Sequence, residues 1–429
     1  MTSNPFSFGN PVSDPSRFFG REREIRQITD RLQSSAFEST SVVGERRIGK
    51  TSLLKHLANP EVAEQMGLSP DEYVVVYVDF QGCNTITQVR FWGRILKRVA
   101  RSLKDEELAA MAKDLVERDQ IDQFDLEDLF LEIDDRGLKL VLLMDEFEYV
   151  TKNENFGLDF FAGLRALAIH YPLAVITATR EALVDLCHSE SIKGSPFFNI
   201  FASVILRPFN QEDSQELVEG IMGESPLQFS EEIRTAIYEM AGGHPIFLQM
   251  AGYFFFEGLQ MGLQEGELTD HVERNFLEQA EPHFMYQWDH LTDHERISVL
   301  TLLALHHEGN GTPSMDELKE AYQQADYILP DLIKRGLVLE VDNGVSLFSS
   351  MFSRWLITEV SSSTDEDADE ESIHEWVVRT EGLDKTFGDK MKKALPRFKK
   401  SYWALLGDFT VEVGTKVATE FVLKMAGLS

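Results

Sequence analysis

The sequence predicts an α/β fold in the first part of the chain, followed by helical segments and a small C-terminal module. Four short apolar runs rich in β-branched residues, at 39–43, 73–80, 138–144 and 173–179, alternate with helical patterns. Apolar runs without polar alternation are typical of a parallel sheet that helices cover on both faces. After about Pro208 these runs stop and helical patterns succeed one another. We therefore expect an α/β domain with helical domains after it.

Composition limits the classes of protein to consider. The chain has 429 residues, enough for two or three domains, and a formal net charge of −31, which opposes a general approach to DNA. Cys83 and Cys187 lack the spacing of metal ligands, so neither zinc nor a disulfide framework is expected. A cytoplasmic protein is expected, because the N-terminus has no secretory pattern and no run reaches the ~18 apolar residues of a spanning helix.

The elements of the first part follow in order from these patterns. Residues 1–17 contain three prolines and suit a flexible arm, and folded structure is expected from near Phe18. A helical pattern occurs at 22–32, before the first strand, and others occur between the strands at 50–57, 87–103 and 156–170. The α/β domain is therefore predicted to cover residues 18–208.

The later part divides into four segments by pattern. Successive helical patterns predict a helical lid over 209–284. Residues 285–360 predict three helices and then a hairpin at Asp342-Asn343-Gly344, an arrangement typical of a winged helix. Residues 361–372 hold six acids and no apolar anchor, which indicates a flexible linker. Residues 373–429 form a separate helical module with more bases than acids. The helical patterns before the hairpin lie at 211–222, 230–241, 245–258, 267–279, 293–306, 314–323 and 327–335.

A phosphate-binding loop follows the first strand as GERRIGKT at 44–51. Gly44 and Gly49 let backbone N–H groups turn toward phosphate oxygens, Lys50 reaches the β- and γ-phosphates, and the Thr51 hydroxyl binds Mg²⁺. The loop lies between a β-branched strand and the start of an apolar helix, the context that this motif requires. The sequence therefore predicts a nucleotide site with ATP or ADP and Mg²⁺. Its candidate binding residues are Gly44, Arg47, Gly49, Lys50, Thr51 and Ser52.

The strand at 138–144 ends in two acids, Asp145 and Glu146. We expect Asp145 to hold Mg²⁺ through its water shell and Glu146 to orient and deprotonate the attacking water. A plain interpretation is a strand that meets a solvated turn, since Glu148 continues the acidic run. The upstream loop favours the catalytic interpretation.

The strand at 173–179 delivers Thr179 and Arg180 to its C-terminal end. Ligands of open α/β sheets bind at that edge, so this pair can report on the γ-phosphate. A helix-capping threonine followed by an exposed arginine explains the same pattern. The residues alone leave both interpretations open.

In combination these motifs resemble the STAND branch of AAA+-related P-loop ATPases, in particular its prokaryotic nSTAND and archaeal-ATPase-like members. The resemblance covers about residues 18–358. It implies an ATPase domain, a helical lid and a winged helix that close on nucleotide and open to form a homo-oligomer. It also implies that Arg21 lies near the adenine, that Arg180 acts as a sensor and that Pro245 packs the lid over the nucleotide. The motifs that carry it are FGRE at 19–22, GERRIGKTSLL at 44–54, LLMDEFE at 142–148, TATRE at 177–181, GGHPIFLQ at 242–249, RGLV at 335–338, LFS at 347–349 and RWL at 354–356.

The chain departs from the family pattern in two respects. It has none of the long repeats that serve many members as sensors, so the signal is expected to come from a separate protein. The winged-helix segment also lacks an obvious histidine for the β-phosphate, which leaves open how ADP would hold a resting state.

The tail combines a basic cluster with an amphipathic helix. Seven Lys and Arg residues lie within 385–400, and from Asp408 polar and apolar residues recur at helical spacing. The tail suits an acidic membrane surface, the acidic body of the same protein, a second tail or a separate effector, and a solvated helix face remains the plain interpretation.

Our leading hypothesis is a signal-transducing ATPase switch in which ATP binding and slow hydrolysis control oligomerisation and effector recruitment, in bacterial defence. The alternative is an origin-recognition-like ATPase that binds DNA through its winged helix. Strong DNA binding is not expected, because residues 291–357 carry few bases. A scaffold with an inactive site is disfavoured by the intact Lys50, Thr51, Asp145 and Glu146.

Overall fold

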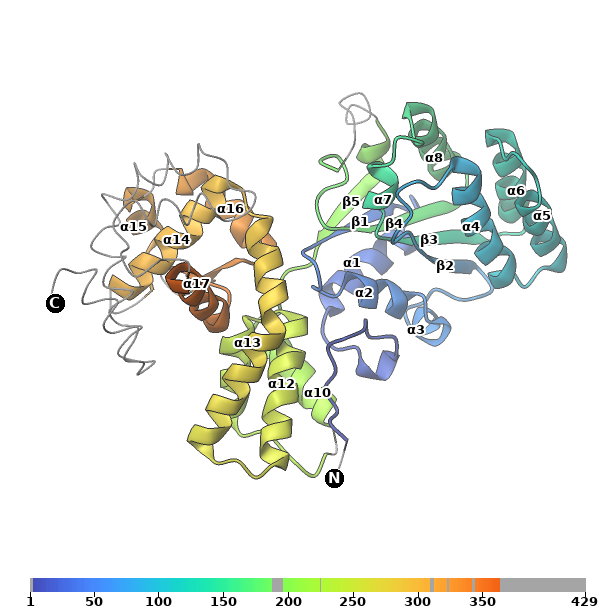
Figure 1. Cartoon of the computed structure of the whole chain (residues 1–429). Helices are drawn as coiled ribbons and strands as arrows, with labels where there is room; N and C mark the ends of the chain where they lie inside the picture. The colour runs from blue at the N-terminus through green and yellow to red at the C-terminus, as the bar shows by residue number, and fades with distance from the viewer. Residues whose placement is uncertain are drawn as a thin grey trace, which may run out of the picture. The chain divides into compact units, whose positions relative to one another are not determined.

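The computed structural model describes residues 3–186, 196–223, 225–308, 312–321, 324–341 and 344–362. The predictions for the acidic linker beyond Ser362 and for the C-terminal module fall outside these residues. The chain separates into two compact units, one formed by residues 9–207 and one by residues 1–8 together with the chain from Pro208 onward (Figure 1). Each unit is described by itself.

A parallel five-stranded sheet organises the unit of residues 9–207, in the order β2-β3-β4-β1-β5. Four of its strands match the predicted runs, and the sequence patterns did not reveal β5. That strand is only partly buried, so it lacks the continuous apolar character of the others. The strands are β1 (Ser39–Val43), β2 (Tyr73–Asp79), β3 (Lys139–Asp145), β4 (Leu173–Thr179) and β5 (Phe201–Ile205).

Helices cover both faces of this sheet. Alternate residues of β3 point to opposite faces, so Leu142 joins one core and Leu143 the other. The Leu142 core includes residues of α4, α5, α6 and α8, whereas the Leu143 core includes α1, α2 and α3. The predicted α/β class with helices on both faces is therefore observed. The helices are α1 (Glu22–Gln33), α2 (Lys50–Leu57), α3 (Pro60–Gln65), α4 (Gln88–Ser102), α5 (Glu106–Val116), α6 (Gln123–Asp135), α7 (Glu148–Thr151) and α8 (Leu158–His170).

The second unit is mainly helical and has an aromatic core. Its largest fully buried side chains are phenylalanines of several helices, among them Phe247, Phe284 and Phe352. Three helices, α14 to α16, precede an antiparallel pair, β6 and β7, and α17 follows. The elements are α10 (Gln211–Met222), α11 (Glu231–Ala241), α12 (Pro245–Gln260), α13 (Glu265–Asp289), α14 (Asp293–Glu308), α15 (Met315–Ala321), α16 (Ala325–Arg335), β6 (Val338–Val341), β7 (Gly344–Leu347) and α17 (Ser350–Ser362).

Helix α13 is longer than its sequence pattern predicted. The sequence pattern predicts a helix that ends at Gln279, but α13 continues through Pro282 to Asp289. Phe284 and Trp288 are buried on this extension, and their packing compensates for the backbone hydrogen bond that proline cannot make. The domain boundary predicted between residues 284 and 285 therefore falls inside a helix.

The N-terminal segment is packed rather than free. Phe6 is 2% exposed and stacks on Phe229 at 5.7 Å between ring centroids. The Asn4 side chain donates to the Tyr253 carbonyl at 2.9 Å, and the Ser7 N–H donates to Gln249 at 3.1 Å. The prolines and small polar residues of 1–17 predict an arm without such contacts. The stacking of Phe6 on Phe229 joins distant parts of the chain, so composition does not indicate it. Farther along this segment is a short 3₁₀ helix, Pro15–Arg17.

Candidate active site

The loop between β1 and α2 depends on its two glycines. Gly49 lies in the left-handed region at φ +102°, which glycine adopts without strain. A Cβ at Gly44 would lie 2.9 Å from the Leu206 carbonyl oxygen, and the Gly44 N–H donates to the Thr179 carbonyl at 3.2 Å. The loop therefore stays close to the ends of β4 and β5 and leads into α2, whose N-terminus attracts anions.

Lys50 is held inside this loop. Its side chain is 7% exposed, and its Nζ donates to the carbonyl oxygens of Gly44 at 2.7 Å and Glu45 at 3.0 Å. Burial lowers the pKa of Lys50, while the charges of Glu148 and then Glu146 act in the opposite direction. A buried ammonium group beside loop backbone is suited to bind a phosphate oxygen.

Asp145 ends β3 as a buried carboxylate with several donors. It is 1% exposed, Tyr77 donates its hydroxyl to Oδ2 at 2.8 Å, and the Glu146 N–H donates to Oδ1 at 3.0 Å. Burial raises the pKa of Asp145, and hydrogen bonds with the side chains of Thr51 and Tyr77 oppose that shift. The structure thus brings together Thr51 of the loop and Asp145 of β3, the two residues that the sequence analysis named as metal ligands.

These residues fit a magnesium ion that binds together with a nucleotide. Within the described ranges, no group of three or more His, Cys, Asp or Glu side chains is arranged to hold a metal by itself. Mg²⁺ usually takes only one or two protein oxygens and completes its shell with phosphates and water. A threonine hydroxyl hydrogen-bonded to a carboxylate, as in Thr51 and Asp145, supplies that kind of donor pair.

Glu146 follows Asp145 in an unusual backbone conformation. Its φ is +53°, which is uncommon for a residue other than glycine and often marks a functional position. The side chain is half-buried, and burial followed by the charge of Glu148 raises the pKa of Glu146 to about 7. A carboxyl group with such a pKa is suited to exchange a proton near neutral pH.

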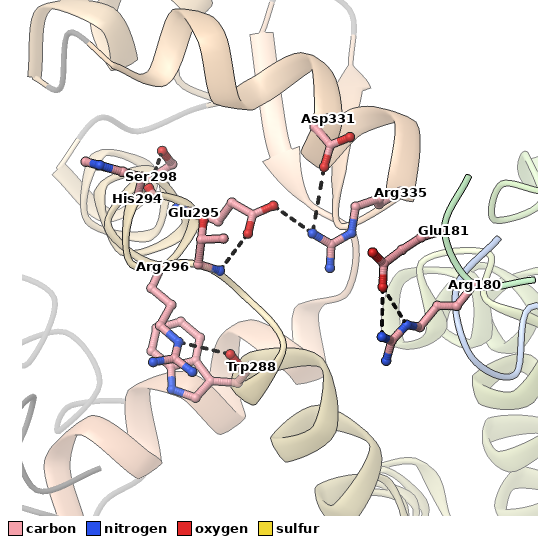
Figure 2. A network of polar contacts seen from close by, with 10 residues as sticks. Arg180, Glu181, Trp288, His294, Glu295, Arg296, Ser298, Asp331 and Arg335 are labelled. Atoms are coloured by element: carbon pink, nitrogen blue, oxygen red, sulfur yellow. Dashed lines mark hydrogen bonds and ion pairs between the residues drawn. The ribbon is translucent and has the colours of Figure 1, made fainter. Parts of the chain in front are cut away.

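The end of β4 is tied to the turn after β3. Thr179 is buried and donates its hydroxyl to the Glu181 carbonyl at 2.8 Å, while Arg180 forms an ion pair with the Glu181 carboxylate at 2.8 Å (Figure 2). The Arg180 N–H donates to the carboxylate of Glu148, whose pKa burial raises. The backbone of Arg180 therefore contacts the acidic turn at Glu148, whereas its guanidinium pairs with Glu181.

Arg21 connects the start of α1 to the loop. It is buried, occupies the left-handed N-cap position at φ +73°, and donates to the Ile48 carbonyl at 3.2 Å and to Glu24 at 3.3 Å. This contact supports the loop from the side of α1. The structure therefore associates Arg21 with the loop, and its position near the adenine stays a prediction from the family resemblance.

Arg47 and Ser52 contact the N-terminal segment. Arg47 donates to the Gly9 carbonyl at 3.2 Å, and the Val12 N–H donates to Ser52 Oγ at 3.1 Å. Residues 9–12 therefore lie along the phosphate-binding loop. Nothing in the sequence pattern indicated this contact, since it joins residues about forty positions apart.

Pro245 belongs to the other unit, where it starts α12 after Gly242 and Gly243. Both glycines have positive φ, and a Cβ at Gly243 would lie 1.9 Å from the Phe209 carbonyl oxygen. The Phe209 N–H in turn donates to the Gly243 carbonyl at 2.8 Å. The segment therefore needs glycine for a close backbone approach, and proline suits the first turn of the helix that follows.

Two further site residues were not predicted. Tyr77 lies on β2, which pairs with β3, and its role depends on a pairing between strands far apart in sequence. Glu148 was assigned no role from the sequence, where it only continues the acidic run, but it contributes the largest charge interaction at Lys50. Its position in the sequence, three residues after Asp145 at the start of α7, is the signal that could have indicated it.

Comparison with known proteins agrees with this geometry. The family model for Novel STAND NTPase 2 matches residues 30–304, more than half of the chain. The chain belongs to the Novel STAND NTPase 2 family. The fold and the loop are accordingly those of a P-loop NTPase, and the STAND resemblance is confirmed.

Individual relatives of this STAND NTPase are distant in sequence. An uncharacterized ATP-binding protein of Methanocaldococcus jannaschii is 23% identical over 273 residues, which are 53% of this chain and 70% of that protein. A Walker-type ATPase of Pyrococcus abyssi is 17% identical, with a TM-score of 0.53 over 81% of this chain and 98% of its own. The ORC2 protein of Aeropyrum pernix gives 15% identity and a TM-score of 0.48, over 80% and 94% of the two chains. The Pyrococcus structure shows that the fold is shared.

Proposed function

We propose that this STAND NTPase is a signalling switch in which ATP binding and slow hydrolysis control oligomerisation and the recruitment of an effector, in bacterial defence. The observation that carries the proposal is the joined arrangement of Lys50, Thr51 and Asp145. The buried Lys50 ammonium bonds the loop backbone, while Thr51 meets Asp145 at the end of the neighbouring β3. This arrangement suits ATP with Mg²⁺ better than it suits a purely structural role.

Each side chain would have a defined task at the nucleotide. Lys50 would bind the β- and γ-phosphates, and Thr51 and Asp145 would hold Mg²⁺, which neutralises phosphate charge. Tyr77 fixes the orientation of the Asp145 carboxylate by its hydrogen bond. Glu146 would accept the proton of the attacking water at its carboxylate. Burial and then the charge of Glu148 raise the pKa of Glu146 to about 7, which suits this carboxyl group to exchange a proton near neutral pH.

The N-terminal segment supports a switch that involves both units. Residues 4–8 pack among helices of the second unit, and residues 9 and 12 bond the loop residues Arg47 and Ser52. If phosphate binding moved the loop, it would therefore also move residues 9–12, which continue directly into the segment that the buried Phe6 anchors. We accordingly propose residues 209–284 as the lid, with Pro245 at its nucleotide side, and Arg21 and Arg180 as adenine-side and sensor residues.

We propose that α14 to α16 with β6 and β7 form a winged helix. The alternative function, a DNA-binding ATPase, is weakened because most Lys and Arg side chains of this region contact other residues of the protein. Lys319 pairs with Asp326 at 2.8 Å, and Arg335 pairs with Glu295 at 2.6 Å (Figure 2). Arg354 pairs with Glu273, and the buried Arg296 donates to the Trp288 carbonyl at 3.0 Å. Residues 291–357 contain five Lys and Arg side chains, and four of them are occupied by these internal contacts, which leaves little charge for phosphates.

The experiment that tests the proposed function combines nucleotide content with mass. Purified wild type would be denatured to identify the released nucleotide, and its mass would be measured by light scattering with ADP and with a nonhydrolysable ATP analogue. We expect bound nucleotide and a larger assembly in the ATP-like state. The absence of bound nucleotide, or an equal mass with ADP and with the ATP analogue, would contradict the switch.

A further inference from the structure

Helix α4 carries an unusual concentration of positive charge on one face. At 100° per residue, five bases fall within one side of the helix, and the helix has no acidic residue. Three of them are exposed and two are half-buried. We call this set the basic face of α4. It consists of Arg90, Arg94, Lys97, Arg98 and Arg101.

The basic face forms no ion pair within the described part of its own unit, although the charge of Asp79 acts on Arg98. In the described part of the chain no ion pair joins these five bases to an acid, although the chain has 72 acidic and only 41 basic residues. Burial, then the charges of Arg94 and Arg101, lower the pKa of Arg98. Like charges at a spacing of four residues destabilise a helix. A cluster of five bases on one helix face of a protein with a net charge of −31 indicates an anionic partner.

Helix α6 has a face with the opposite chemistry. Phe124 is 74% exposed and Leu131 is 50% exposed, which is unusual for large apolar side chains. Asp128 and Asp135 alternate with them, are exposed, and form no ion pair with any described residue. We call Phe124, Asp128, Leu131 and Asp135 the acidic face of α6. It has exposed apolar area to cover as well as charge to pair.

The two faces match in spacing. Asp128 and Asp135 are seven residues apart, and so are Arg90 and Lys97. Seven residues of α-helix span about 10.5 Å in both cases, so two aligned helices can pair both charges at once. The methylene stems of arginine and lysine can then cover Phe124 and Leu131. Arg94 and Arg101 have the same seven-residue spacing and offer a second set of partners.

We propose that the basic face of α4 in one copy docks on the acidic face of α6 in the next copy. Both faces belong to one unit and lie on different helices, with α5 packed against each of them (Figure 1). An interface between two different surfaces is head-to-tail and repeats, so it builds a ring or a filament. This proposal rests on the proposed function, because it names the surfaces through which the switch assembles.

A nucleic acid is the other partner that the basic face could attract. Its phosphates would bind the arginines without any apolar contact. That partner would leave the exposed Phe124 and Leu131 unexplained and would not involve α6. Docking between copies accounts for both faces, and we therefore prefer it.

Two charge-reversed variants test the proposal. The first is Arg90→Glu with Lys97→Glu, and the second is Asp128→Lys with Asp135→Lys, all at exposed positions. Sedimentation velocity would be measured at low salt, with ADP and with a nonhydrolysable ATP analogue. We expect each variant alone to associate at least about tenfold more weakly than wild type. An equimolar mixture should regain association, because each variant then meets a complementary face on the other.

Controls separate this interface from its alternatives. Arg23→Glu with Lys152→Glu makes the same charge change at exposed positions outside both faces and should associate like wild type. A wild type that stays monomeric up to about 0.1 mM, or a mixture that does not regain association, would overturn the proposal. If only the α4 variant lost association, and nuclease treatment also dissolved the wild-type assembly, the basic face would be assigned to nucleic acid instead. ATP binding is measured on the same samples. If ATP binds normally but the charge-reversed variants assemble like wild type, the interface is refuted and the switch is not. If no ATP binds but mixing the two variants restores association, the switch is refuted and the interface is not.

Discussion

At the scale of single residues, the acids at the end of β3 differ in their surroundings. Asp145 accepts hydrogen bonds from Tyr77 and from the Glu146 backbone, so its charge has partners. Glu146 is half-buried next to Glu148, and its pKa is raised to about 7. Burial raises the pKa of both carboxyl groups, but hydrogen bonds oppose that shift at Asp145, whereas the charge of Glu148 adds to it at Glu146. These surroundings suit Asp145 to a cation and Glu146 to proton transfer.

The raised pKa of Glu146 predicts a pH dependence of stability without nucleotide. A carboxyl group whose folded-state pKa exceeds its ordinary value of 4.5 binds protons more tightly when folded, so stability falls as pH rises from about 4.5 to about 7. Glu146→Gln should show less of this fall, whereas Glu117→Gln on the exposed end of α5 should behave like wild type. Thermal unfolding at about pH 5 and about pH 7.5 measures it. Equal pH dependence in wild type and Glu146→Gln would contradict the assignment.

The hydrogen bond from Tyr77 predicts a second effect. Tyr77→Phe removes a 2.8 Å bond to a buried carboxylate, which should lower the free energy of unfolding by about 1–3 kcal/mol. Tyr73→Phe on the same strand is a matched control, since its hydroxyl makes longer contacts of 3.3 and 3.5 Å. Denaturant unfolding should rank Tyr77→Phe as the less stable variant. The opposite ranking would show that Asp145 does not depend on Tyr77.

At the scale of elements, glycine determines how α11 and α12 join. Gly243 has φ +71°, and an added Cβ would lie 1.9 Å from the Phe209 carbonyl oxygen. Gly243→Ala should therefore destabilise the second unit by about 2–4 kcal/mol. Gly266→Ala in the first turn of α13 meets nothing within 4 Å and should be neutral or stabilising by up to about 1 kcal/mol. Calorimetry of the two variants tests this contrast, and similar melting temperatures would refute it.

The elements also show what local sequence predicts and what it does not. The loop at 44–51 and β3 were predictable, because glycine spacing and apolar runs are short-range patterns. β5, the Tyr77 bond and the Phe6 contact were not, since each depends on a partner far along the chain. The extension of α13 through Pro282 was missed for a related reason: the buried Phe284 and Trp288 outweigh a local helix breaker.

At the scale of the whole molecule, charge and connectivity bear on assembly. The net charge of −31 disfavours contact between like surfaces, so association requires local basic regions such as α4. The chain passes between its units at Phe8–Gly9 and again at Arg207–Pro208. No helix within the described ranges has the length and apolar character needed to cross a bilayer.

The measurement that tests the central claim most directly is ATP binding and mass in Lys50→Ala. This change removes the cation that the loop holds at 2.7 Å from the Gly44 carbonyl, so ATP affinity should fall by at least about a hundredfold and the ATP-dependent increase in mass should disappear. Lys55→Ala on α2 is the matched control and should bind ATP and assemble like wild type. Calorimetric titration and light scattering would be run on both variants. Wild-type ATP affinity in Lys50→Ala would contradict the account.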